Sequence, residues 1–425
     1  MIKSAEYRYW PLAITGMVFF VGYLDRINLA VVAPVMSREL GIKPGKMGIL
    51  FSIFLIGYAI MPLPAGLMAD KVGSHKVLTL TTLWFSVFCA LTALGTGFLS
   101  LSLIRLLFGF GEGASQPAMF KANQTWSGNR ERGLGTAILL TGVNMGGIVA
   151  PLMSVVILRN SGWRPVFYLM AVPGLVVALL VWLYVKDRPQ ELLSGLEFER
   201  AGIVLSGEKP VNRTLLYRSS SLWAMFLAWF GFNLTFWGLI SWVPSYFFDV
   251  RHVNLRSLGI WSSLPWVGGL LGAYVGGWIG DRVLHRKYVQ MVAWLLAGAC
   301  TGLTYYVERP SLAVMALMLA YFAIQCGAAV HYSLMMVLVG VEAQGTAIGS
   351  MQFVGVWAGF IAPPIIGFIL QATNSYAIPF MILGGGISIA GLLVSIVQER
   401  RIDLGISAVA ATLEAGAAAN SEATL

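Results

Sequence analysis

The chain has 425 residues, of which 57% are hydrophobic and 11% charged, and its formal net charge is +9. A soluble domain usually carries about 25% charged residues, so this composition excludes an ordinary soluble protein and indicates one that lies in a lipid bilayer. The positive charge reflects the bias of lysine and arginine toward one side of the membrane, and no nucleic-acid partner is expected.

Twelve windows are long and apolar enough to cross the membrane, since a spanning helix needs about 20 mainly apolar residues. The windows are 11–36, 46–69, 77–97, 99–121, 133–158, 164–185, 221–248, 257–280, 288–307, 311–339, 346–371 and 376–397. We therefore predict an all-α membrane protein of twelve transmembrane helices. The first window runs through two charges and has no small-residue cleavage site, so we do not expect a cleaved signal peptide.

Four charges lie inside these windows: Asp25 and Arg26 in the first, and Arg105 and Glu112 in the fourth. Each charge at the bilayer centre costs at least about 2.5 kcal/mol, so four of them indicate a function. Arg105 and Glu112 share a helix face but are separated by about 10.5 Å of axial rise, so we expect each to find its own partner. Asp25 and Arg26 point about 100° apart, so one can face the fourth helix while the other faces a central cavity.

The chemistry of these groups separates their expected roles. Arg26 keeps its proton and presents a planar fork that suits a carboxylate, so we predict that it binds an anionic substrate. Asp25 and Glu112 can become neutral when desolvated and are predicted to carry protons, with Arg105 holding Asp25 ionised in one state. The alternative is a salt-bridge cluster that only fixes helix packing. His331, in the tenth window, is expected to be a satisfied interior histidine rather than a proton relay.

The loops after the second and eighth windows repeat one another. "GLMADKVGSHKVL" and "GWIGDRVLHRKYV" align Asp70 with Asp281, 211 positions further on, which is close to half the chain. A repeat at this scale is typical of transporters with two pseudo-symmetric bundles and a substrate site between them. We predict that this repeat controls gating and does not merely anchor the topology. Its residues are Gly66, Asp70, Lys71, Lys76, Gly277, Asp281 and Arg282.

The longest polar run before the tail separates the sixth window from the seventh. We expect an N-terminal six-helix bundle over 1–186, a cytoplasmic linker over 187–219, a C-terminal six-helix bundle over 220–400 and a disordered tail over 401–425. Lysine and arginine are more frequent in the loops that are cytoplasmic if both termini are cytoplasmic. This predicts a multi-pass protein of the cell inner membrane with both termini inside.

The three cysteines carry no expected chemistry. Cys89, Cys300 and Cys326 lie in apolar windows without metal-like spacing, so we expect small core residues and neither a metal nor another cofactor. The chain has no GxxxxGK[ST] loop, so we do not expect ATP to drive it.

Four further segments, "GYLDRINLAVVAP", "RLLFGFGEGASQPA", "GWRPVFYL" and "SWVPSYFFD", together with the two loops, resemble the major facilitator superfamily. Within it they look like the anion:cation symporter family, which includes bacterial hexuronate, glucarate and galactonate transporters, animal sialin and vesicular glutamate transporters. The resemblance implies the major facilitator fold and places the protonation sites of the sugar-acid members at Asp25 and Glu112. It implies that Arg26 is the carboxylate ligand and that Arg105 pairs with the aspartate. The first loop departs from the family at Ser74, where a basic residue is usual.

The predicted pocket differs from that of the family in the eleventh helix. Trp357 falls near where many members have asparagine, which allows a less hydroxylated or aromatic acid, whereas Asn144 in the fifth helix falls near a polar pocket position. Other candidates lie near mid-helix, with packing or lipid exposure as the alternative, or match pocket tyrosines of the family. These are Asn233, Trp237, Gln325, Gln352, Tyr23 and Tyr58.

We predict a proton-coupled symporter that imports an organic anion, foremost a sugar acid (hexuronate, aldonate or aldarate), by alternating access and as a monomer. An aromatic or tartrate-like carboxylate is the alternative substrate. An enzyme is not expected, because the buried charges supply neither a nucleophile with its base nor a metal-ligand cluster. A membrane receptor that transports nothing is the alternative of a different class.

Overall fold

The computed structural model describes residues 9–126, 132–187, 213–339, 343–400 and 402. Most of the predicted linker and of the predicted tail therefore lies outside the described residues. Within the described part every regular element is a helix.

The first half of the chain folds into eight helical segments. They are α2 (Tyr9–Glu39), α3 (Pro44–Ser52), α4 (Phe54–Ile60), α5 (Pro62–Val72), α6 (Ser74–Thr92), α7 (Phe98–Trp126), α8 (Arg132–Ser161) and α9 (Arg164–Tyr184). The second predicted window is formed by α3, α4 and α5 in series. Pro62 lacks a backbone N–H and begins α5, and the axis bends there by 42°.

The second half begins with a short 3₁₀ turn and continues with six helices. They are η2 (Arg213–Arg218), α11 (Ser220–Asp249), α12 (Leu255–Arg282), α13 (Arg286–Tyr306), α14 (Pro310–Val339), α15 (Gln344–Thr373) and α16 (Ala377–Ser395). Ten of the described helices are long and apolar enough to cross a membrane, and the bent series α3 to α5 makes an eleventh. The remaining predicted span, the window 288–307, corresponds to α13, which has 21 residues and packs against α14 and α16. The predicted all-α membrane fold is confirmed.

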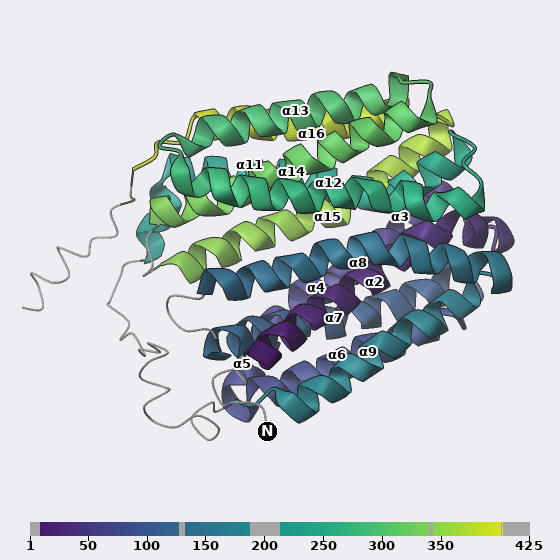
Figure 1. The fold of residues 1–425 in the computed structure, drawn as a ribbon, viewed down its shortest axis with the longest axis horizontal. Coiled ribbons are helices and arrows are strands. Elements are labelled where there is room, and N and C mark those ends of the chain that lie inside the picture. Colours follow the sequence, from purple (N-terminus) through teal and green to yellow (C-terminus); the bar gives the residue numbers. More distant parts are fainter. Residues whose placement is uncertain (1–8, 127–131, 188–212, 340–342, 401, 403–425) are drawn as a thin grey trace, which may run out of the picture.

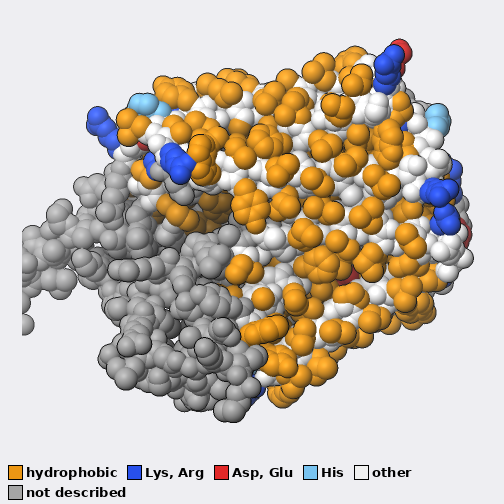
Figure 2. All heavy atoms as spheres, in the orientation of Figure 1, with side chains coloured by type: hydrophobic (Ala, Val, Ile, Leu, Met, Phe, Trp, Pro, Cys, Tyr) orange, Lys and Arg blue, Asp and Glu red, His pale blue; other side chains and the backbone are white. Residues whose placement is uncertain are grey.

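The helices gather into two groups that follow the order of the chain (Figure 1). In the first group α2 lies against α7, α8 and α9, and in the second α13 packs between α14 and α16. The groups meet chiefly where α8 packs against α12, α3 against α15 and α2 against α11, and α4 also contacts α15. Figure 2 shows hydrophobic side chains covering the flank of the molecule, with lysine and arginine gathered near its two ends. Such a belt suits contact with lipid.

The two groups are tightly joined where α2 leads into α3, here called the α2–α3 end. Arg38 Nη2 of α2 donates to Asp249 Oδ1 of α11 at 2.8 Å. Helices α3 and α15 approach so closely that a Cβ atom at Gly48 would lie 2.3 Å from the carbonyl oxygen of Pro363. This end of the molecule is closed.

At the opposite end, where α5 leads into α6 (the α5–α6 end), a carboxylate caps α6. Asp187 Oδ1 accepts hydrogen bonds from Ser74 Oγ at 2.6 Å and from the backbone N–H of His75 at 3.0 Å, and Oδ2 contacts His75 Nδ1. Burial raises the pKa of Asp187, but the hydrogen bonds from Ser74 and His75 outweigh it and hold its pKa below the ordinary value. The departure from the family pattern at Ser74 thus supplies a donor to this cap.

The second half repeats this cap. Glu399 accepts from the backbone N–H of Arg286 at 3.3 Å and of Lys287 at 2.9 Å, at the first turn of α13. Glu399 lies 212 positions after Asp187, close to the spacing of the two similar loops. The repeat therefore extends to the capping carboxylates, which the sequence comparison did not identify.

Candidate functional site

The buried charges meet between α2 and α7. Arg26 Nε donates to Glu112 Oε1 at 2.6 Å, and both side chains are 5% exposed. Glu112 thus has a partner other than Arg105, as expected, and that partner is Arg26 of α2. The reason is Gly22, one turn before Arg26, where a Cβ atom would lie 2.9 Å from Glu112 Oε1. The absence of a side chain there lets the glutamate reach the arginine.

Aromatic rings enclose the same guanidinium. The Arg26 Cζ atom lies 4.7 Å from the ring centroid of Tyr23 and 4.8 Å from that of Tyr58. Trp237 of α11 and Phe54 of α4 follow at 5.3 Å and 5.5 Å. Ring faces attract a cation, most strongly where water is excluded. Three of these rings, those of Tyr23, Tyr58 and Trp237, belong to predicted pocket residues. Phe54 was not predicted, although it lies one turn from Tyr58.

Arg105 also binds α2, but not through a carboxylate. Its Nη1 donates to the backbone carbonyl of Asp25 at 3.1 Å and its Nη2 to Asn28 Oδ1 at 3.4 Å. No described carboxylate oxygen lies within ion-pair distance of this guanidinium, and its Nε is buried without a partner among the described residues. The expected ion pair between Arg105 and the Asp25 carboxylate is therefore absent from this structure.

The carboxyl group of Asp25 has a thiol as its partner instead. Cys89 Sγ of α6 donates to Asp25 Oδ1 at 3.1 Å, and Asn28 Nδ2 donates to the same sulfur at 3.6 Å. Asp25 Oδ2 is buried without a hydrogen bond from any described residue. Since Cys89 had been assigned only a packing role, this contact was missed. A lone cysteine in an apolar helix gives no sequence signal for such a role.

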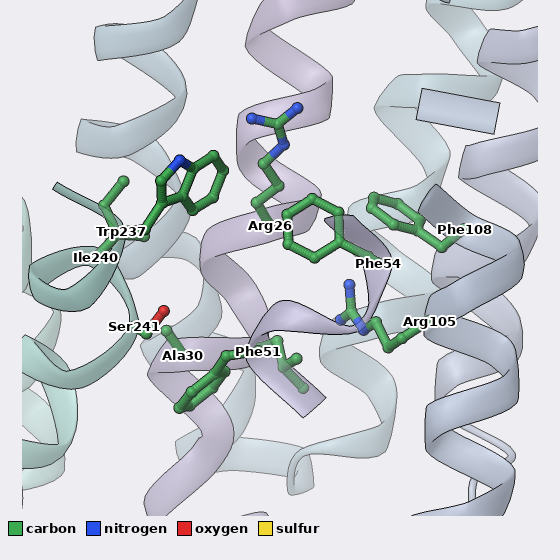
Figure 3. A pocket seen from close by; sticks show the side chains of 10 residues that line it. Arg26, Ala30, Phe51, Phe54, Arg105, Phe108, Trp237, Ile240 and Ser241 are labelled. Atoms are coloured by element: carbon green, nitrogen blue, oxygen red, sulfur yellow. The ribbon is translucent and has the colours of Figure 1, made fainter. Parts of the chain in front are cut away.

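Two small cavities flank Arg26. One, of about 20 Å³, is lined by both Arg26 and Arg105, and Figure 3 shows the two arginines entering from α2 and α7 with the Phe54 ring between them in this view. The other, of about 10 Å³, is lined by Gly22 and Glu112. Each is large enough for about one water molecule. In this structure the space around the charged groups is almost closed.

Two predicted pocket residues meet between α8, α12 and α14. A Cβ atom at Gly269 would lie 3.3 Å from Asn144 Oδ1 and 3.3 Å from Gln325 Cγ. This part of the interface continues toward Arg26 through Trp266, whose ring contacts Tyr23 edge-on at 6.2 Å. Asn144 and Gln325 therefore lie beside the same glycine, Gly269, near the rings that surround Arg26.

A second polar pair lies between α11 and α15. Trp229 Nε1 donates to Gln352 Oε1 at 2.8 Å, and Asn233 Nδ2 donates to the carbonyl oxygen of Trp229 at 2.9 Å. A Cβ atom at Gly355 would lie 2.6 Å from Asn233 Nδ2. Trp229 of α11 thus hydrogen-bonds both predicted residues, and Asn233 lies beside Gly355 of α15.

Trp357 does not join either pair. Its side chain is 48% exposed and contacts Phe353 and Phe360 of its own helix. The prediction that it lines the pocket is wrong, because the glycine face of α15, with Gly355 and Gly359, turns toward α11 and carries Trp357 outward. The alternative of lipid exposure holds for this residue.

His331 lies inside the second group of helices. Its ring stacks between those of Trp229 at 5.2 Å and Trp294 at 5.5 Å, and its Nδ1 is 2.7 Å from Gln290 Nε2. Its Nε2 is buried with no partner among the described residues. The histidine is interior as expected, but only one ring nitrogen is satisfied.

The cations of the predicted gating repeat lie at the surface. Lys71 and Lys76 are exposed. The Cζ atom of Arg282 lies 4.1 Å from the ring centroid of Trp278 in its own helix. These positions suit cations that anchor a helix end as well as cations that gate.

The glycines of the repeat have open surroundings. A Cβ atom at Gly66 would meet one side-chain atom at 3.8 Å, and one at Gly277 would meet nothing within 4 Å. The side chains of Asp70 and Asp281 lie outside the described part of the structure. The gating role of the repeat stays a prediction.

The sequence is similar to those of known membrane transporters. The sequence matches the Major Facilitator Superfamily over residues 15–363. It is 29% identical to a "Probable sulfoacetate transporter" of Cupriavidus necator, with 92% of this chain and 94% of that protein covered. It is also 29% identical to a hexuronate transporter of Bacillus subtilis, with 88% and 90% covered. A "Probable L-galactonate transporter" of Escherichia coli is 27% identical, with 91% and 88% covered.

A solved structure agrees in fold. A bacterial homologue of the human lysosomal transporter Spinster, in an inward-facing and occupied conformation, superposes with a TM-score of 0.74 at 17% identity. The superposition covers 92% of this chain and 95% of that one. At this identity the likeness concerns the fold alone.

Proposed function

The chain belongs to the Major Facilitator Superfamily, and from this we propose that it is a proton-coupled symporter that carries an organic anion across the membrane by alternating access. Its family and relatives are transporters and not enzymes, as predicted from the sequence. The relatives named for sulfoacetate, hexuronate and L-galactonate support an organic acid as substrate. A sugar acid is one form of this proposal, and a compact acid such as a sulfocarboxylate is the other.

One observation carries the coupling: the buried ion pair between Arg26 and Glu112 at 2.6 Å. A substrate carboxylate and the Glu112 carboxylate compete for the same guanidinium. When Glu112 takes a proton, through Oε1 or its unpartnered Oε2, it releases Arg26 to the substrate. When Glu112 loses the proton, the pair forms again and expels the substrate. Proton binding and anion binding thus support one another.

Asp25 supplies the second proposed proton site. One of its oxygens accepts from the Cys89 thiol, and the other is buried and unpartnered within the described part. Arg105 binds the backbone of the same residue, so a change of charge on Asp25 acts on the contact between α2 and α7. The alternative, a cluster that only fixes packing, gives no reason for two unpartnered carboxyl oxygens beside arginines.

For the transport cycle we propose that residues 1–186 and 220–400 rock as two bundles, with 187–219 as the linker and 401–425 as a tail. The α2–α3 end faces outward, and both termini lie in the cytoplasm of a cell whose inner membrane holds the protein as a monomer. The Arg38 to Asp249 bond and the contact of Gly48 with Pro363 must then open to admit substrate. The loop repeat gates the opposite end.

The test is Glu112→Gln in proteoliposomes. The amide has nearly the shape of a protonated carboxyl, so we expect exchange of substrate for substrate to continue and pH-driven accumulation to stop. Glu308→Gln, at an exposed position, is the matched control and keeps both modes.

Three results would contradict the proposal. Equal loss of both modes in Glu112→Gln would make Glu112 a structural or substrate-binding residue. Uptake that follows a sodium gradient and does not depend on pH would show that sodium, and not the proton, is the coupling ion. A protein that exchanges no organic acid at all would be a receptor.

A further inference from the structure

Arg105 is a buried cation without a carboxylate partner among the described residues. The residue is 2% exposed, and its described contacts are two carbonyl oxygens, of Asp25 and Asn28, and the ring faces of Phe108 and Phe167. Dipoles and rings only partly replace the hydration that a guanidinium loses on burial, and the described carboxylates act on Arg105 only from beyond ion-pair distance, so its burial is costly. An anion beside Arg105 would remove that cost.

Arg26 and Arg105 line the same cavity, which has room for about one water molecule in this structure, and Figure 3 shows the Phe54 ring between the two side chains in this view. A larger molecule that contacts both arginines therefore enters when the bundles part in the proposed transport cycle. Seven of the ten residues that line the cavity are apolar, and Ser241 supplies its one hydroxyl group. The wall can therefore bind two negative groups but few hydroxyls. A chain of hydroxylated carbons here would lose hydrogen bonds to water without replacing them.

We propose that Arg105 is a second anion site, so that the transported molecule is a compact dianion with one acidic group on Arg26, the other on Arg105, and no hydroxyl groups between them. This rests on the proposed symport. Asp25, Arg26, Arg105 and Glu112 together carry no net charge when all are ionised. Protons on both carboxyl groups leave two positive charges, which a dianion neutralises and a monoanion does not.

The test compares three ligands of one carbon skeleton on the purified full-length protein, by isothermal titration and counterflow, at a pH where every acid group of the ligands is ionised. Succinate has two charges, its monomethyl ester has one, and tartrate has two charges and two hydroxyls. We expect succinate to bind about tenfold or more tighter than the monoester, since each charged hydrogen-bonding group contributes that much, and tighter than tartrate.

The variant Arg105→Gln should bring the ratio of succinate to monoester affinity close to 1, while Arg256→Gln, at an exposed position of α12, leaves the ratio as it is. If Arg105→Gln does not fold, the affinities of the unaltered protein for the three ligands still test the inference. Equal affinity for succinate and its monoester would overturn the inference while leaving the symport intact. Tighter binding of tartrate, or displacement of succinate from Arg105 by chloride, would overturn it as well. If the unaltered protein exchanged none of the acids, the proposed function itself would be rejected.

Discussion

The two groups of helices bury different chemistry. The first group contributes the four buried charges of α2 and α7. The second contributes rings: Trp229 stacks on Phe232 at 4.4 Å, and Phe232 on Phe236 at 5.4 Å and on Trp294 at 5.8 Å. Among the described residues of the second group, His331 is the one buried side chain of the Asp, Glu, His, Lys and Arg types.

This difference suggests a division of labour. Charges that attract protons and anions stay within one bundle, where their distances survive a rocking motion. The facing bundle supplies an apolar wall, of which Trp237 lies against both Phe54 and the Arg26 guanidinium. When the bundles rock, the wall moves over the charges and changes their access to water. The predictions below test this division, beginning with the charged half.

The largest effect is expected for Arg26→Lys. An ammonium keeps the charge but loses the planar fork and most of the attraction to four ring faces, so we expect counterflow to fall by about 100-fold or more while expression is retained. Initial rates in proteoliposomes, with Arg256→Lys as the control, measure this. Unchanged substrate affinity in Arg26→Lys, together with a loss in Tyr58→Phe, would place the anchor elsewhere.

A smaller but general loss is expected for Asp25→Asn. The substitution leaves two buried arginines with one carboxylate, and removing one member of a buried charge set costs about 3–5 kcal/mol. Both exchange and pH-driven uptake should fall, about tenfold or more, and the thermal midpoint should drop. If Asp25→Asn instead spares exchange, as expected of Glu112→Gln, the two carboxyl groups have interchangeable roles.

For the apolar wall that the second group supplies, the test is Gly359→Ala. A Cβ atom there would lie 2.6 Å from Trp237 Cδ1, so the indole must move away from Arg26. Overpacking of this kind costs about 1–3 kcal/mol, and we expect the apparent KM for the acid to rise about fivefold or more.

Gly349→Ala on the same helix is the control, because a Cβ atom at Gly349 meets nothing within 4 Å. An unchanged KM in Gly359→Ala would mean that the wall does not touch the substrate.

The sequence predicted the fold and the four charges for the same reason: in a bilayer, apolar length determines each span, and a charge within a span stands out. It did not predict which groups would pair. Whether Glu112 reaches Arg26 depends on the space at Gly22, and the outward direction of Trp357 depends on how α15 is rotated against α11. Both are properties of helix packing, which a single sequence does not encode in its hydropathy. The role of Cys89 was missed for the same reason.

The smallest effects are expected at the two capping carboxylates. They allow the two halves of the chain to be compared at a distance from the buried charges. Asp187 binds a hydroxyl, a backbone N–H and an imidazole, whereas Glu399 binds two backbone N–H groups, so Asp187→Asn should lower the thermal midpoint more than Glu399→Gln. Both groups are near solvent, and we expect shifts of about 2 °C or less.

Because the folded-state pKa of Asp187 lies below its ordinary value of 3.8, its contribution to stability is present above that value and is lost as the pH falls through the folded-state pKa. The gap between Asp187→Asn and the unaltered protein should therefore be full at pH 7 and shrink below about pH 4 in melting curves. A difference in thermal midpoint that does not change with pH would show that the Asp187 carboxylate acts by its shape and not by its charge.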